Sequence, residues 1–373
     1  MFELTNELRP CFGLKIVDPG WERIVAKPSP YHSHATIAYR DGNMLRRFIQ
    51  TGENIYKEYE IQEQLSEDGK FLLPKTGKGK PVLFTAANLE KRTGIGMCLS
   101  YFRDRNWYTN LFLYSHDSQK SYFDNNYEPL YTSGIEDFRD WVEDWCEETT
   151  QEDLADIAAF AAQPRQHVKF REGDVFLFKI NRRLWGYGRV LVDYALMRRK
   201  KIPFWDVLMG KPTACSVYHI VTERQDVSIE ELRNLKSLPS VHMMDNRLFY
   251  GDFEIIGNIP IGEKEDYPIM YGDSISALEK GVMLQCGKLY RKIEGEKAFS
   301  FQFRNHRNGF DLCFKLPVLR QCIEAGSNEP YWAQHGHYGH QDLRNPKFRA
   351  ELEQIAAQFG LDPAELSVTY QEG

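Results

Sequence analysis

Short alternating runs of apolar and polar residues dominate the first 130 positions of the chain. Apolar runs flank the pair Pro19-Gly20, and two further runs meet at Asp41-Gly42, where a hairpin turn is expected. Residues 106 to 123 are rich in aromatic side chains and alternate in part. This pattern predicts a curled or meandering β-sheet.

The spacing of apolar residues becomes helical near Ser133. Ser133 and Glu136 have the spacing of a capping box, which marks the start of a helix. The apolar positions that follow are typical of one helix face: Phe138, Trp141, Val142 and Trp145. We expect this helix to break near Thr149-Thr150 and to continue to about Phe160. Pro164 then blocks helix continuation, so a linker is expected there.

The second half of the chain again reads as short strands with a few helices. A second capping box, Ser228 with Glu231, predicts a helix to Lys236, and Asn345-Pro346 predicts the start of a C-terminal helix that ends at Gly360. Strands and helices do not alternate regularly, which favours an α+β fold over βαβ units. The expected strands are 175 to 180, 187 to 194, 215 to 221, 253 to 261 and 282 to 293.

These patterns predict two β-rich domains joined by an acidic helical segment. Residues 1 to 132 would form an N-terminal β-rich domain of unknown role. Residues 133 to 165 would form the acidic helical segment and linker. Residues 166 to 373 would form an α+β domain with a small antiparallel, barrel-like sheet, flanking helices and C-terminal helices.

Composition and charge narrow the class of protein. Of the 373 residues, 42% are hydrophobic, 27% charged and 13% aromatic, which is typical of a globular, β-rich chain. The first residues lack a basic segment followed by an apolar run, so we expect a soluble, unexported protein. The seven cysteines are widely spread without a C-x-x-C pair, which indicates reduced thiols and a cytoplasmic location. The net charge of −6 disfavours nucleic acid as the main partner.

Familiar catalytic and cofactor signatures are missing from the sequence. The glycine-rich stretches at residues 76 to 81, 94 to 99 and 186 to 191 lack the spacing of a phosphate loop or a dinucleotide fingerprint. We therefore predict no cofactor and no enzymatic activity. The alternative is a metal-dependent hydrolase, because three histidines in a glycine-rich stretch have the spacing of an open zinc site: His335, His337 and His340. The competing interpretation of that stretch is a surface loop, which predicts no metal.

The segment 136 to 156 is strongly acidic. It holds ten carboxylates against Arg139 alone, a local charge of −9. Either this is the solvated face of an amphipathic helix with a tryptophan-rich core side, or it is a docking surface for a basic protein such as a nuclease. The candidate partner-binding residues are Asp140, Trp141, Asp144, Trp145 and Glu148.

A basic and aromatic group spans residues 182 to 201. Basic residues between aromatic ones suit single-stranded nucleic acid, but a hairpin turn and a solvated loop explain the same composition. The group contains Arg182, Arg183, Trp185, Tyr187, Arg189, Tyr194, Arg198, Arg199, Lys200 and Lys201. Nucleic-acid binding therefore stays an alternative function.

Two strand motifs occur between residues 168 and 275. In the first, a strand that opens with Gly-Asp-Val-Phe is followed, after a short turn, by an aromatic-Gly-Arg-Val strand; in the second, a glycine precedes a short apolar run and a turn with proline. The residues of these motifs are Gly173, Asp174, Val175, Phe176, Tyr187, Gly188, Arg189, Val190 and Gly257. In these motifs residues 168 to 275 resemble the immunity protein 26 family of bacterial polymorphic toxin systems. These motifs carry no catalytic chemistry, so we interpret them as structural.

The resemblance implies an antidote: a cytoplasmic bacterial protein that binds a cognate toxin and blocks it. We expect stoichiometric occlusion through an interface of standard size, roughly 1,600 Å². The expected contact surfaces are the acidic helix and the turn at residues 181 to 187, through Arg182, Arg183, Trp185 and Tyr187. Neither a membrane nor nucleic acid is an expected partner.

Overall fold

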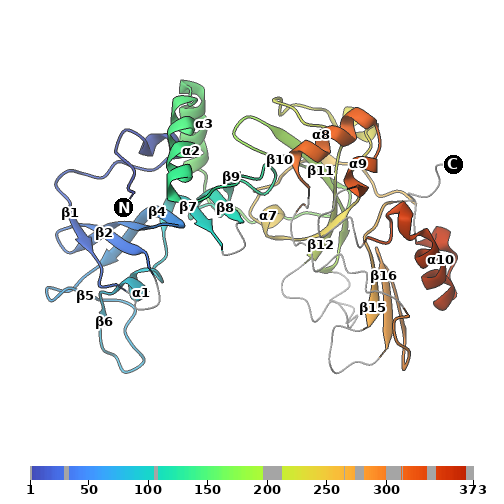
Figure 1. Ribbon diagram of the computed structural model, residues 1–373, viewed down its shortest axis with the longest axis horizontal. Helices are drawn as coiled ribbons and strands as arrows, with labels where there is room; N and C mark the ends of the chain where they lie inside the picture. The colour runs from blue at the N-terminus through green and yellow to red at the C-terminus, as the bar shows by residue number, and fades with distance from the viewer. Residues whose placement is uncertain are drawn as a thin grey trace. The chain divides into compact units, whose positions relative to one another are not determined.

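A computed structural model describes most of the chain. The described residues are 2–28, 33–104, 108–195, 212–263, 265–273, 281–299, 312, 314–333 and 342–366. The chain divides into two compact units, Met1–Gln166 (unit 1) and His167–Gly373 (unit 2). Each unit has its own sheets and its own hydrophobic core (Figure 1).

Unit 1 is built on one antiparallel sheet of seven strands. Asp41-Gly42 makes the predicted turn between the second and third strands, with Gly42 in the left-handed region at φ 57°. The strand order is β1 (Glu22–Val25), β2 (Ala35–Asp41), β3 (Met44–Gly52), β4 (Ile55–Gln64), β7 (Ile95–Arg103), β8 (Thr109–Ser115) and β9 (Ser121–Asp124). The prediction of a meandering N-terminal sheet is confirmed.

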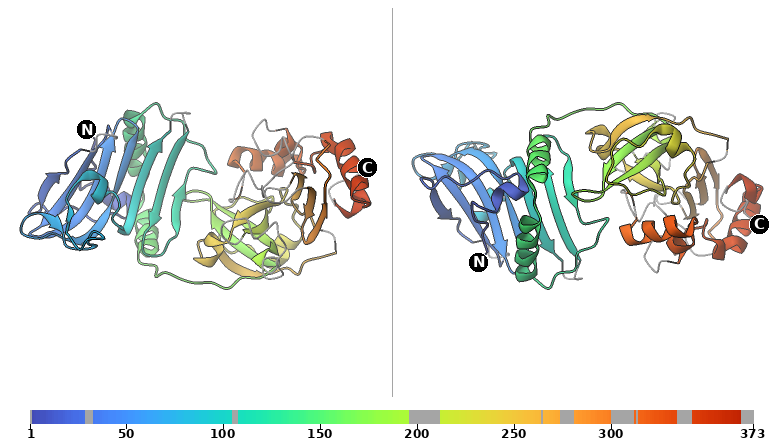
Figure 2. Two further views of the ribbon diagram at one scale, coloured as in Figure 1. Left: turned by 90° about the horizontal axis from the view of Figure 1, so that it is seen from below. Right: turned by 90° about the horizontal axis from the view of Figure 1, so that it is seen from above.

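Two helices cover one face of this sheet (Figure 2). They are α2 (Ile135–Glu147) and α3 (Gln151–Ala161), and the predicted break between them lies at Thr149-Thr150. The 3₁₀ turn η1 (Arg9–Phe12) packs with them on the same core. The core side chains on this face include Ile37, Ile49, Leu99, Leu111 and Phe138.

The other face of the sheet carries a second core. Ala38, Phe48 and Cys98 belong to it, although each is the chain neighbour of a residue in the first core, because successive side chains of a strand point to opposite faces. The elements on this face are the short strands β5 (Lys70–Phe71) and β6 (Val82–Leu83) and the helical turn α1 (Ala86–Leu89).

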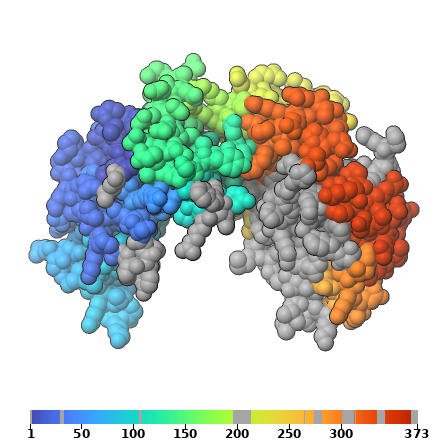
Figure 3. All heavy atoms as spheres, in the orientation of Figure 1, coloured from blue at the N-terminus to red at the C-terminus, as the bar shows by residue number. Residues whose placement is uncertain are grey.

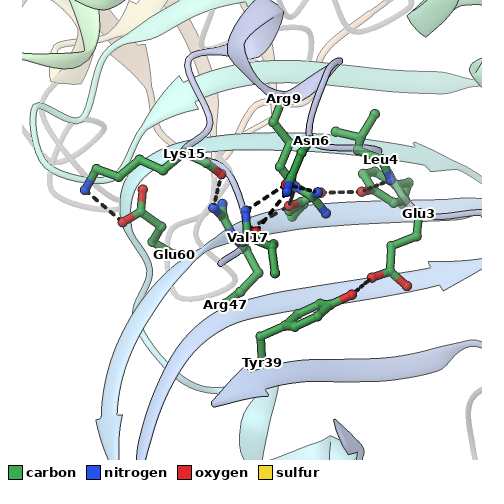
Figure 4. Close-up of polar contacts among 11 residues, drawn as sticks. Glu3, Leu4, Asn6, Arg9, Lys15, Val17, Tyr39, Arg47 and Glu60 are labelled. Carbon is green, nitrogen blue, oxygen red and sulfur yellow. Dashed lines mark hydrogen bonds and ion pairs between the residues drawn. The ribbon is translucent and has the colours of Figure 1, made fainter. Parts of the chain in front are cut away.

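A buried polar cluster ties the N-terminal segment to the sheet (Figure 4). Arg9 Nε donates to Glu58 Oε1 at 2.7 Å, and both side chains are buried. Arg47, which is also buried, donates to the carbonyl oxygen of Lys15. Burial lowers the pKa of Arg47, and the carboxylate of Glu58 opposes that shift. The segment before β1 is therefore an integral part of unit 1.

Unit 2 contains a five-stranded antiparallel sheet with order β13-β12-β11-β10-β14. Short helices accompany it: α6 (Ile229–Arg233), which begins at the predicted Ser228–Glu231 capping box, and α7 (Asn246–Phe249). The strands are β10 (Asp174–Lys179), β11 (Trp185–Asp193), β12 (Pro212–Val217), β13 (Val241–Met244) and β14 (Glu254–Asn258).

A three-stranded sheet and the C-terminal helices complete unit 2. The run 282 to 293 is a hairpin rather than one strand, because Gly287 reverses the chain at φ 52°. The sheet has order β15 (Ile269–Asp273), β16 (Val282–Cys286) and β17 (Leu289–Ile293). The helices are α8 (Leu316–Ala325), α9 (Glu329–Trp332) and α10 (Arg349–Gln358), with 3₁₀ turns η4 (Pro346–Phe348) and η5 (Pro363–Glu365).

Arg344 links the C-terminal region to the loop before β15. Its guanidinium donates to both carboxylate oxygens of Asp342, to Asp266 Oδ2 at 2.7 Å, and to Oγ and the carbonyl oxygen of Ser240. The Arg344 side chain is 1% exposed, so these five hydrogen bonds replace its hydration. Burial raises the pKa of the Asp266 carboxyl, and Arg344 opposes that shift.

The α+β class is confirmed, and two details differ from the prediction. The sheets of unit 2 are open where the structure describes them, so the barrel-like sheet is not seen there. The predicted capping box of Ser133 with Glu136 is also wrong. The N–H and Oγ of Ser133 donate to Asp137 instead, and Gly134 is the N-cap of α2. The hydrogen bonds from Ser133 lower the pKa of Asp137.

Candidate functional site

Helix α2 separates its apolar and charged residues cleanly. Phe138, Val142 and Trp145 are buried against the sheet, whereas Trp141 is half-buried. The Trp145 ring stacks on Phe12 with centroids 6.1 Å apart, and its Nε1 donates to the carbonyl oxygen of Cys11 at 3.0 Å. Trp145 is therefore a core residue that holds η1 on the helix.

The opposite side of α2 and the start of α3 form an exposed acidic face. Arg139 lies within it, 3.1 Å from Glu136 and 3.7 Å from Glu143. Figure 3 shows these two helices, in green, at the molecular surface. The exposed carboxylates that define the acidic face are Glu136, Asp140, Glu143, Asp144, Glu147, Glu148 and Glu152.

The other carboxylates of the stretch 136 to 156 have structural roles. Asp137 binds Ser133 before α2, and Asp153 forms a capping box with Thr150 at the start of α3. Asp156 Oδ2 accepts a hydrogen bond from the hydroxyl of Tyr122 at 2.8 Å. These three carboxylates already bind groups within unit 1, so only part of the local charge of −9 is available to a partner.

The β10–β11 hairpin places two glycines beneath two phenylalanine rings. Phe176 pairs with Gly188 and Phe178 with Gly186. A Cβ atom on Gly188 would lie 2.4 Å from the Phe176 ring and 2.6 Å from the carbonyl oxygen of Ser216. The Phe176 ring stacks on Phe253 with centroids 5.0 Å apart. Glycine is required here for close packing, not for nucleotide binding.

Gly173 and Asp174 fix the start of β10. Gly173 has φ 86°, its N–H donates to the carbonyl oxygen of Val190, and its own carbonyl oxygen accepts from the N–H of Ile259. Asp174 is buried, and Asn258 Nδ2 donates to its Oδ1 at 2.8 Å. These contacts join β10 to β11 and β14.

Gly257 on β14 allows close packing, as Gly188 does on β11. A Cβ atom there would lie 2.5 Å from Cδ1 of Ile229, so the glycine lets α6 approach the sheet. Gly257 pairs with Val175, next to a bulge in the β10–β14 register.

Arg189 forms an ion pair across unit 2. Its guanidinium contacts the carboxylate of Glu265, and these side chains are 12% and 15% exposed. The backbone N–H of Gly262 also donates to Glu265 Oε1, at 2.7 Å. Tyr218 lies beside the pair: burial raises the pKa of Tyr218, and Arg189 opposes that shift. Arg189 thus fixes the loop between β14 and β15, in line with a framework role.

The turn at residues 181 to 187 is only partly at the surface. Arg183 is exposed, Trp185 is half-buried, and Lys179 Nζ lies 5.0 Å from the centroid of the Trp185 ring. Arg182 is 9% exposed and Tyr187 is fully buried. The Tyr187 hydroxyl donates to the carbonyl oxygen of Arg224 at 2.9 Å, and burial raises its pKa.

The remaining candidates lie mainly outside the described residues. The histidines His335, His337 and His340, and the basic run from Arg198 to Lys201, all fall there. Within the described ranges no group of three or more His, Cys, Asp or Glu side chains has the arrangement of a metal site. The described helices include none that is long and apolar enough to cross a membrane.

Sequence reasoning missed the partners that hold the motif residues. Glu265 is 76 positions from Arg189, and Asn258 is 84 positions from Asp174. In the sequence, Glu265 and Asn258 are distinguished only as polar residues just outside an apolar run. That signal is too common to identify a pair.

The fold and these contacts define an α+β chain in which the five-stranded antiparallel sheet of unit 2 needs glycine at several positions for close packing. Residues 171–281 match the family model of Immunity protein 26, which confirms the resemblance predicted for residues 168 to 275. The match covers less than a third of the chain and supports an immunity role in toxin systems. Comparison with curated proteins and with solved structures gives no match.

Proposed function

We propose that this protein is a cytoplasmic immunity protein that neutralises a cognate bacterial toxin by binding it stoichiometrically. The observation that carries the proposal is the match of residues 171–281 to Immunity protein 26. The proposal assigns no catalytic step to the chain. Occlusion alone accounts for neutralisation when the interface covers the active surface of the toxin.

The acidic face of α2 and α3 is the first proposed contact surface. Its seven exposed carboxylates create a negative field that would attract a basic toxin surface, such as that of a nuclease. Asp140, Asp144 and Glu148 are the central charges, and half-buried Trp141 offers apolar area beside them. Trp145 leaves the proposed set because its indole is buried.

The turn at residues 181 to 187 is the second proposed contact surface. Arg183 and Trp185 present a charge and an aromatic edge at the surface of unit 2, a combination enriched in binding hot spots. Arg182 and Tyr187 support the turn from inside, so their loss would act through folding.

Co-expression with the toxin tests the function directly. The toxin to use is the C-terminal domain of a secreted protein encoded beside this chain. We expect this protein to rescue growth and to abolish the toxin's activity in vitro at a ratio of about one to one. Full inhibition by a small fraction of an equivalent would instead indicate catalysis and would contradict the proposal. Isothermal titration calorimetry measures the ratio independently.

A further inference from the structure

The β5–β6 hairpin of unit 1 is strongly basic. Residues 70 to 83 contain four lysines and no carboxylate: Lys70, Lys75, Lys78 and Lys80. Every residue from Leu73 to Pro81 is exposed. The hairpin projects from the lower edge of unit 1 in the view of Figure 1, in light blue.

The base of this hairpin is anchored firmly. Phe71 is fully buried, and the guanidinium of Arg92 lies 3.8 Å from the centroid of its ring. Arg92 Nη1 also donates to the carbonyl oxygen of Leu73 at 2.6 Å. At the tip, the N–H of Thr76 donates to the carbonyl oxygen of Lys80 at 2.8 Å. The lysines therefore project from a fixed base.

Most of the positive charge on the hairpin is not neutralised by unit 1. Lys70 pairs with Asp68. Within the part of the chain that the structure describes, Lys75, Lys78 and Lys80 form no ion pair. Three like charges within six residues repel one another, so binding an acidic partner would relieve that repulsion.

Exposed apolar side chains lie among these lysines. Leu73 and Leu83 are 68% and 59% exposed. A hollow of about 670 Å³ is lined by Lys70, Lys78, Lys80, Pro81 and Leu83. Charge and apolar surface therefore occur together at one site.

We propose that the β5–β6 hairpin binds an acidic protein segment whose apolar side chains enter this hollow. A protein fits better than nucleic acid, because leucine and proline contact apolar side chains, whereas bases stack on aromatic rings. The hairpin and the acidic face lie on opposite faces of one sheet. An acidic partner would therefore bind independently of a basic toxin, which goes beyond the proposed function.

The test uses the full-length protein and a fluorescein-labelled peptide of about twelve residues that mixes Asp and Glu with Leu and Phe. Fluorescence anisotropy measures binding at ~50 mM and ~200 mM salt. We expect the triple variant Lys75→Glu, Lys78→Glu, Lys80→Glu to weaken binding at least about tenfold. Leu83→Ser should weaken it about threefold, because the hollow loses apolar surface.

A matched control reverses three exposed charges in unit 2: Lys169→Glu, Arg233→Glu and Arg320→Glu. This variant has the same net charge as the hairpin variant and should bind the peptide as the wild type does. The same peptide with Asn and Gln in place of Asp and Glu should not bind. Circular dichroism establishes that each variant is folded.

Three results would overturn the proposal. The first is equal loss of peptide binding in the hairpin variant and the control variant. The second is tighter binding of a single-stranded oligonucleotide of equal charge than of the peptide. The third is self-association of the wild-type protein in sedimentation velocity that is lost both in the hairpin variant and in a variant with reversed charges on the acidic face. That result would identify a second copy of this chain as the partner that binds the hairpin.

Discussion

Charged residues serve opposite purposes in helix α2 and in unit 2. On α2 and at its C-cap, the side chains of Asp140, Asp144 and Glu148 are exposed. In unit 2, Arg189 with Glu265 and Arg344 with Asp266 are enclosed and join distant segments. Residue type alone does not separate the two groups in the sequence, because carboxylates occur in both.

For Arg189, which is on the strand β11, the difference follows from the geometry of the elements. A surface helix has one apolar stripe, so its remaining positions face water. A strand in the middle of a sheet that is covered on both faces has no positions that face water. Its polar residues therefore need buried partners. Charge on α2 is therefore available for binding, whereas charge on β11 mainly stabilises the fold. Substitutions in the two groups should therefore differ strongly in their effect on stability.

Replacing Arg344 should have the largest effect on folding. Arg344→Met removes five buried hydrogen bonds and leaves Asp342 and Asp266 without their cation. We expect a loss of about 4 kcal/mol in the free energy of unfolding, measured by chemical denaturation. Arg349→Met is the control, because Arg349 is 70% exposed and pairs with Glu353 at the surface. Similar losses in the two variants would contradict the enclosed role of Arg344.

Adding one methyl group to β11 should be almost as damaging. In Gly188→Ala the new Cβ meets the Phe176 ring and the Ser216 carbonyl oxygen, and the backbone oxygen is hard to move. We expect a loss of about 3 kcal/mol in the same denaturation experiment. Gly77→Ala, where the new Cβ has no neighbour within 4 Å, should change the stability by less than about 0.5 kcal/mol.

Breaking the Arg189–Glu265 pair should have a smaller effect, because both side chains retain some exposure to water. Arg189→Met should cost about 2 kcal/mol, and a double-mutant cycle with Glu265→Gln should show coupling between the two residues. The surface residue Arg224, which is 61% exposed, provides the control variant Arg224→Met. Additive effects of the Arg189 and Glu265 changes would rule out a direct interaction.

Reversing the acidic face should leave stability almost unchanged. The triple variant Asp140→Lys, Asp144→Lys, Glu148→Lys should shift the free energy of unfolding by no more than about 0.5 kcal/mol. Its association rate with the toxin should fall at least about tenfold at low salt, as measured by stopped-flow fluorescence.

The control for that experiment reverses three exposed carboxylates of unit 2: Glu294→Lys, Glu324→Lys and Glu353→Lys. It should associate with the toxin close to the wild-type rate, because its charge changes are in unit 2 and leave every carboxylate of the acidic face in place. An unchanged rate in the acidic-face variant would show that α2 is not the interface.

Local signals in the sequence were sufficient to predict the positions of elements whose stabilising contacts join residues close in the chain. The Ser228–Glu231 capping box, the Asp41-Gly42 turn and the break at Thr149-Thr150 all lie where they were expected. The strand β15 was missed, because its burial comes from β11 and the C-terminal helices. No local pattern reports on contacts with residues so far away.

For the acidic stretch the sequence left open whether its carboxylates form a solvated helix face over a tryptophan-rich core side or a docking surface. The sequence identified the acidic stretch, yet only the structure separates the capping residues Asp137 and Asp153 from the exposed carboxylates. It also moves Trp145 and Tyr187 from proposed contacts into the cores of their units. Large aromatic side chains serve interfaces and cores equally well, so their type alone cannot assign them.

The sequence by itself determined the α+β class, the acidic character of α2 and the immunity-type motifs between residues 168 and 275, because each depends on the local order of residues. Tertiary structure decided which charges meet solvent, which glycines lie under rings, and that the basic β5–β6 hairpin and the acidic helices lie on opposite faces of one sheet. These properties depend on pairs of residues that are distant in the chain and adjacent only after folding.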